Sequence, residues 1–178
     1  MASATHDNAD TSDSVASSDG NSSLPGSSGD NPPALRVDFY VLEEASATGR
    51  LKVACRLAEK AYLSAQTALV WHTDPDELKT LDELLWTFMD GSFVPHEMLS
   101  ADASTFETPV VLSAGTMPSR DVDVIINLAP DLPGCLARTH RVAEIIDGDE
   151  ARRRAGRARF KVYRDMGIQP ASHNIRKE

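Results

Sequence analysis

The chain has 178 residues and a formal net charge of −9 at pH 7, with 41% hydrophobic and 25% charged residues. This length favours a single domain, and the acidic balance differs from the basic domains typical of generic duplex-DNA binders. The sequence contains no apolar run of about 18 residues, so no membrane span is expected, and two cysteines without a disulfide or zinc motif favour a reducing, cytoplasmic location.

The beginning of the chain differs in composition from the rest. Residues 1–35 are rich in Ser, Asp, Asn, Gly and Pro, and all their charges are acidic. Such a segment cannot bury enough apolar surface to offset its ordering entropy, which predicts a disordered acidic arm. We expect one folded domain over residues 36–168 and a polar C-terminal tail over residues 169–178.

The first part of the domain alternates strand and helix patterns. The β-branched and aromatic run RVDFYVL, residues 36–42, predicts the first strand. Apolar residues at helical spacing predict an amphipathic helix over residues 50–64. The run TALVW, residues 67–71, is typical of a short buried strand.

A second helix is expected after this strand, capped by Thr73 or Asp74 and ending near Phe88. Its leucines form one apolar stripe, and Trp86 lies off that stripe. Phe93 follows in a predicted non-helical bend. Trp86 and Phe93 are therefore candidate contact residues, since Trp is enriched in binding hot spots. The alternative is that a neighbouring loop covers Trp86.

Three further strands are predicted over residues 109–112, 122–128 and 141–146. Their continuous apolar runs indicate burial on both faces of a parallel sheet. Asp121 and Asp123 precede the most apolar run and could form a metal-binding pair, although solvated carboxylates near a strand end are the favoured interpretation.

A basic helix is expected over residues 149–167, which hold seven of the 18 Lys and Arg residues of the chain. One face is small and apolar and is predicted to pack on the domain: Ala151, Ala155, Ala158, Val162 and Met166. The opposite face combines an aromatic ring with cations: Arg153, Arg157, Phe160, Lys161 and Arg164. This face fits either a solvated basic helix with one stray aromatic or a site for an anionic, partly hydrophobic partner.

The alternating pattern predicts an α/β fold, a Rossmann-like three-layer sandwich with a mostly parallel sheet. The first strand-to-helix turn, EEASATG, lacks the glycines of a dinucleotide site, and no phosphate-binding loop occurs. The five histidines have no ligand spacing. We therefore expect no cofactor, no metal site and no catalytic residues.

Several segments in the same order resemble the chi subunit family of bacterial DNA polymerase III. They are the strand DFYVL, the helix LDELLWTF followed by SFVPH, the strand DVIINL and the C-terminal ARFKVYRDMG. The resemblance covers about residues 37–167. It implies a non-catalytic accessory subunit that links the clamp loader, through the psi subunit, to single-stranded-DNA-binding protein.

The resemblance also implies which residues bind partners. Arg157, Phe160 and Lys161 match family positions implicated in binding the acidic C-terminal tail of single-stranded-DNA-binding protein, and Arg153 stands where the family has a lysine. Arg164 and Ile146 extend this expected site with a cation and an apolar wall. Trp86 and Phe93 match a region associated with psi or another partner, and contact with DNA is expected to be indirect.

Two alternatives remain at this point. The same helix could bind single-stranded nucleic acid directly, in which case affinity would fall steeply with salt. An α/β enzyme would need an acid–base or nucleophile constellation that the sequence does not show. A further hypothesis is that the acidic arm mimics the partner tail and competes for the basic helix.

Overall fold

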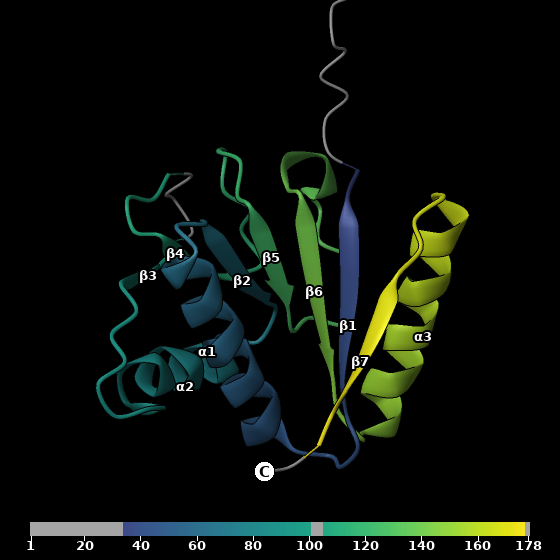
Figure 1. The fold of residues 1–178 in the computed structure, drawn as a ribbon, viewed down its shortest axis with the longest axis horizontal. Coiled ribbons are helices and arrows are strands. Elements are labelled where there is room, and N and C mark those ends of the chain that lie inside the picture. Colours follow the sequence, from purple (N-terminus) through teal and green to yellow (C-terminus); the bar gives the residue numbers. More distant parts are fainter. Residues whose placement is uncertain (1–33, 101–104, 177–178) are drawn as a thin grey trace, which may run out of the picture. The chain divides into compact units, whose positions relative to one another are not determined.

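The computed structural model describes residues 34–100 and 105–176 of the chain. Residues 1–33, which make up all but the last two residues of the acidic arm, lie outside the described part of the chain. The hypothesis that this arm competes with the partner tail therefore also concerns residues outside it. Figure 1 shows a sheet flanked by helices. In chain order the elements are β1 (Arg36–Leu42), α1 (Ala47–Leu63), β2 (Ala68–His72), α2 (Pro75–Thr87), β3 (His96–Met98), β4 (Val110–Ala114), β5 (Val124–Asn127), a 3-10 turn (Leu136–Arg138), β6 (Arg141–Ile146), α3 (Glu150–Asp165) and β7 (Ala171–Ile175).

Seven parallel strands form one sheet in the order β3-β4-β2-β5-β6-β1-β7. The predicted α/β class is therefore confirmed. The strands predicted over residues 36–42 and 141–146 are present with these bounds as β1 and β6. Strands β2 and β4 are buried almost throughout because both of their faces are covered.

Alternate residues of the strands feed two apolar clusters, one on each face of the sheet. The first lies under α1 and α2 and includes Val70, Ile126 and Leu81. The second lies on the face covered by α3 and the longer loops and includes Phe39, Leu69 and Tyr163. The cysteine predicted to lie in the core, Cys55, is fully buried in the first cluster.

Side-chain caps fix where the helices begin. Ser46 accepts from the amide of Gly49 at the start of α1, and Asp74, not Thr73, caps α2. Asp149 caps α3 by accepting from the amide of Arg152. None of the described helices is long and apolar enough to cross a membrane.

The predicted inward face of α3 is wrong. The buried stripe consists of Gly156, Arg159 and Tyr163, whereas Val162 and Met166, expected in the core, are exposed. Phe160, expected to point away from the domain, is half-buried and packs on the second cluster. The reason is that β6 supplies the buried carboxylate of Glu144, which pairs with Arg159, so the side of α3 that carries Arg159 packs on the sheet.

The predicted polar tail also needs correction. Residues 171–175 form β7, which pairs with β1 along its length, from Ala171 beside Asp38 to Ile175 beside Leu42. His173 contributes to this pairing because its Nε2 lies 3.0 Å from the Asp38 carboxylate and its ring stacks on Tyr40. The strand β3 was not predicted either, and only its first residue, His96, falls in the stretch expected to bend, residues 92–96.

The loops after β1 and β6 meet at the carboxyl edge of the sheet, where one chain path turns to α1 and the other to α3. The amide of Gly148 donates to the Glu44 carbonyl at 3.0 Å, and the amide of Ser46 donates to Asp147 at 2.8 Å. A Cβ on Gly148 would lie 2.5 Å from the Ala45 nitrogen. Protein backbone thus occupies the crevice that often holds a ligand in α/β sheets.

Candidate functional site

A groove of about 440 Å³ lies between α3 and the edge of the sheet formed by β1 and β7. Strand β1 and the loop after it provide one wall, the end of β6 provides the floor, and α3 and β7 provide the rest. The lining residues are Phe39, Val41, Glu43, Ile146, Arg153, Gly156, Arg157, Phe160, Ser172 and Asn174.

Aromatic and aliphatic side chains make the inner part of this groove. The ring of Phe160 packs on that of Phe39, with centroids 5.2 Å apart and planes tilted by 59°. Gly156 allows α3 to approach β6 closely, because a Cβ there would lie 2.0 Å from Cδ1 of Ile146. An apolar ligand group can therefore contact Phe160 and Ile146 without a helix side chain between them.

Two arginines of the same groove have different surroundings. Arg153 donates to the backbone carbonyls of Asp147, at 3.3 Å, and Glu43, at 3.0 Å, so its guanidinium ties together the loops after β6 and β1. Arg157 instead makes an exposed ion pair with Glu150, with Nη2 and Oε1 3.2 Å apart. Arg157 is thus the guanidinium better placed to exchange partners.

Two further arginines of α3 face inward and hold the helix on the sheet. Arg159 donates to the fully buried carboxylate of Glu144 on β6, with Nε 2.9 Å and Nη2 2.8 Å from Oε2. Tyr163 and Asn127 also donate to this carboxylate, at 2.8 Å and 3.0 Å. Burial, together with the neighbouring Glu144 charge, raises the pKa of Tyr163, so its hydroxyl remains a donor.

Arg152 contacts the second buried carboxylate. Its Nε and Nη2 donate to the two oxygens of Asp147 at 2.7 Å and 2.8 Å, a bidentate pair. Burial opposes ionisation of Asp147, but the bonds from Arg152 and from the amides of Ser46 and Asp149 outweigh it and lower the pKa. These contacts fix the start of α3 and with it the position of the groove.

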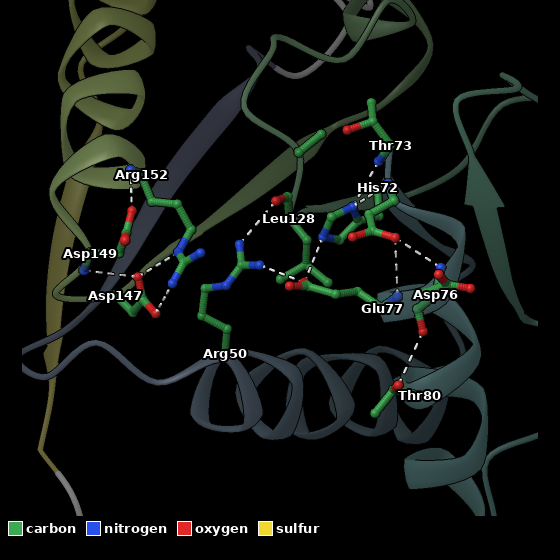
Figure 2. A network of polar contacts seen from close by, with 12 residues as sticks. Arg50, His72, Thr73, Asp76, Glu77, Thr80, Leu128, Asp147, Asp149 and Arg152 are labelled. Atoms are coloured by element: carbon green, nitrogen blue, oxygen red, sulfur yellow. Dashed lines mark hydrogen bonds and ion pairs between the residues drawn. The ribbon is translucent and has the colours of Figure 1, made fainter.

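A polar network near the carboxyl end of β2 joins α1 to α2 (Figure 2). Arg50 donates to Glu77 at 2.7 Å and to the Leu128 carbonyl at 3.0 Å. His72 Nδ1 accepts from the amides of Thr73 and Asp74, so Nε2 carries the proton and donates to Glu77. Burial lowers the pKa of His72. Arg50, His72 and Glu77 thus have partners within the protein and hold α1 and α2 together, which gives these side chains a structural role.

The residues expected to bind the tail fall into two groups. Ile146, Arg153, Arg157 and Phe160 line the groove together. Lys161 and Arg164 are exposed on α3 but do not line it. Their charges can act on a ligand only beyond the groove.

The aromatic residues expected at another contact lie elsewhere. Trp86 and Phe93 are 53% and 59% exposed, and their ring centroids are 5.4 Å apart. Trp86 also packs on His96, the first residue of β3, at 4.8 Å. No covering loop buries Trp86 within the described residues, so the pair forms an exposed aromatic surface, named here the Trp86–Phe93 surface.

The sequence did not reveal the sheet side of the groove. Phe39 and Val41 were assigned to a strand but not to a site, and Ser172 and Asn174 were assigned to a tail. Alternation along β1 places Phe39 and Val41 on one face, which could have indicated the wall. Asp123, considered for metal binding, accepts from the Thr67 amide and hydroxyl, both at 2.8 Å.

Comparisons with known proteins identify similar chains. The family model described as DNA polymerase III chi subunit, HolC, matches residues 35–171. DNA polymerase III subunit chi of Pseudomonas aeruginosa is 39% identical over 140 residues, which cover 79% of this chain and 96% of that protein. The Haemophilus influenzae subunit chi is 27% identical over 143 residues, 80% of this chain and 99% of that protein.

Among solved structures, the crystal structure of T4 UvsW is similar, with a TM-score of 0.54 and 12% identity. The match covers 79% of this chain and 42% of that chain. At this identity the likeness concerns the fold alone.

Proposed function

The chain belongs to the family of DNA polymerase III chi subunits, and from this premise we propose that it is a non-catalytic adaptor of the replication machinery. In this proposal, the groove beside α3 binds the acidic C-terminal tail of single-stranded-DNA-binding protein. A second surface binds the psi subunit and through it the clamp loader. The polymerising activity of the assembly resides in another subunit.

One observation carries the first part of this proposal: a single groove offers both an apolar wall and an exchangeable guanidinium. Phe160 and Ile146 suit a hydrophobic side chain, and Arg157 stands less than one helical turn from Phe160. A peptide C-terminus presents a carboxylate and a side chain on one residue. An acidic tail ending in a hydrophobic residue therefore matches both features, and its other carboxylates would face Lys161 and Arg164.

The test is a titration of a fluorescent peptide that copies the C-terminal tail of the cognate single-stranded-DNA-binding protein. We expect Arg157→Ala to weaken binding about tenfold or more, because loss of a charged hydrogen bond costs about 1.4 kcal/mol or more. Arg154→Ala is the matched control, since Arg154 is exposed on the same helix outside the groove lining. Equal binding by wild type and Arg157→Ala would move the site elsewhere.

The alternative, direct binding of single-stranded nucleic acid by α3, is tested with an oligonucleotide in the same assay. Tight binding of the oligonucleotide alone, falling steeply with salt, would favour the alternative. The adaptor instead requires the partner protein for association with DNA. Failure of the wild-type chain to bind the peptide would remove the basis for the tail site.

The second part of the proposal places psi on the Trp86–Phe93 surface. Exposed aromatic rings that pack on one another lose little conformational entropy on binding, and aromatic residues are enriched at interface hot spots. Phe93 lies in the loop between α2 and β3, and Ser92 beside it donates to Glu59 of α1 at 2.5 Å. The loop is thereby held against α1 and presents Phe93 in a fixed position.

A further inference from the structure

Arg157 of the groove is paired with a carboxylate, Glu150, that does not itself line the groove. Glu150 and Arg157 are seven residues apart on α3, almost two full turns, so both lie on one side of the helix. Their ion pair is solvent-exposed, with side chains 73% and 66% exposed. The pair joins one guanidinium nitrogen to one carboxylate oxygen at 3.2 Å.

Arg153 is less able than Arg157 to bind a ligand carboxylate, because it would lose more hydrogen bonds within the protein. Arg153 already donates to the carbonyls of Asp147 and Glu43, which connect two loops. To bind a ligand with those donors, it would have to leave two backbone acceptors. Arg157 would have to leave only a solvated carboxylate, which water can satisfy.

The geometry points to Glu150 as an internal competitor that occupies Arg157 until the carboxylate of an incoming peptide replaces it. This inference rests on the proposed function and adds the residue that sets its affinity. A ligand carboxylate that meets the guanidinium fork with both oxygens makes two bonds where Glu150 makes one. The site thereby favours a ligand carboxylate that binds Arg157 through both oxygens over one that makes a single bond.

The exchange has a measurable cost for the ligand. While Glu150 holds Arg157, only the remaining fraction of molecules has a free guanidinium, and the apparent affinity falls by that fraction. Removing the competing charge should therefore tighten peptide binding. The gain should be modest, about two- to fivefold, because exposed ion pairs are weak.

The experiment compares wild type with Glu150→Gln in the tail-peptide titration. Asp165→Asn is the matched control, because Asp165 is an exposed acid at the other end of α3 and its replacement changes the net charge equally. We expect Glu150→Gln to bind about two- to fivefold tighter and Asp165→Asn to stay within about twofold of wild type. Glu150 is an acid in the first turn of α3, so its replacement can also lower the stability of the helix. The melting temperature of each variant measures this effect separately from peptide affinity.

A second comparison separates exchange from a long-range charge effect. In an Arg157→Ala background the substitution Glu150→Gln should no longer change peptide affinity, since the guanidinium for which Glu150 competes is absent. Equal tightening in both backgrounds, or no tightening in the wild-type background, would overturn the inference while leaving the tail site in place. Absence of peptide binding by wild type and by Glu150→Gln would overturn the inference together with the proposed function.

Discussion

At the scale of single residues, the buried carboxylates explain how α3 is positioned. Asp147 is fully buried and accepts from the Arg152 side chain and from the amides of Ser46 and Asp149. It thus connects the end of β6, the start of α1 and the first turn of α3. Because Asp147 directly follows Ile146 of the groove floor, its contacts also determine the groove.

We predict that Asp147→Asn destabilises the fold by about 1.5–3 kcal/mol near neutral pH, because hydrogen bonds to a charged group are lost. Water can partly solvate the Arg152 guanidinium in the variant, which limits the loss. The pKa of Asp147 is lowered in the folded state. The unfolded chain therefore takes up the proton first as the pH falls. The stabilisation is fully present above about pH 4 and is lost progressively as the pH falls through the lowered pKa of the folded state.

Urea unfolding of wild type and Asp147→Asn between pH 3 and 7 measures this difference, with Asp165→Asn as the control for an exposed acid. The gap between the two curves should narrow as the pH falls below about 4, because protonation of Asp147 removes the charge that Asn lacks. A stability gap that stays constant over this pH range would contradict a role for the charge.

At the scale of elements, sequence patterns identified most strands and all three α-helices but assigned the wrong face to α3. Hydrophobic periodicity selected the stripe of Ala, Val and Met residues. The real buried stripe carries Arg159 and Tyr163, whose polar groups are satisfied by Glu144. Hydrophobic periodicity cannot reveal this arrangement, because it identifies buried faces by apolar residues alone. Here a charged residue, Arg159, is buried against a carboxylate of the preceding strand β6.

The edge strands were missed for a related reason. The segment of β7 is polar and reads as a tail, because one of its neighbours is solvent and its pairing with β1 uses backbone groups. Its ties to the sheet include His173 on Asp38. Four residues that were assigned to the tail site from the sequence lie together in one groove: Ile146, Arg153, Arg157 and Phe160.

The Glu144 network gives a prediction for the α3 element. Tyr163→Phe removes one donor from a buried carboxylate without changing the shape of the ring, and we expect a loss of about 1.5–3 kcal/mol in the free energy of unfolding. Tyr62→Phe is the control, because the Tyr62 hydroxyl makes no hydrogen bond with the described part of the chain. Denaturant midpoints with unchanged slopes would measure the effect; equal midpoints for both variants would contradict it.

At the scale of the whole molecule, the sheet separates the two proposed contact surfaces. The groove involves β7 at one edge, and the Trp86–Phe93 surface packs on His96 of β3 at the other. Six strand spacings lie between these edges, about 29 Å at roughly 4.8 Å per spacing. Substitutions on the two surfaces should therefore act independently.

This separation predicts that a substitution on either surface weakens binding of one partner only. Phe93→Ala should weaken binding of the psi subunit about 30-fold or more, as expected for truncation of an interface hot spot costing about 2 kcal/mol. The same substitution should leave tail-peptide affinity within about twofold of wild type. Arg157→Ala should show the opposite pattern, and Met166→Ala, an exposed apolar residue after α3, should change neither.

Titrations of purified psi and of the tail peptide against each variant measure both affinities, and a ternary mixture shows whether wild type binds both partners at once. Simultaneous binding follows from surfaces at opposite sheet edges, because neither partner need displace the other. If Phe93→Ala weakened both partners equally while retaining its melting temperature, the two contacts would share one surface. The sheet would then not act as a spacer between the clamp loader and single-stranded-DNA-binding protein, and an adaptor would have to engage its two partners in turn.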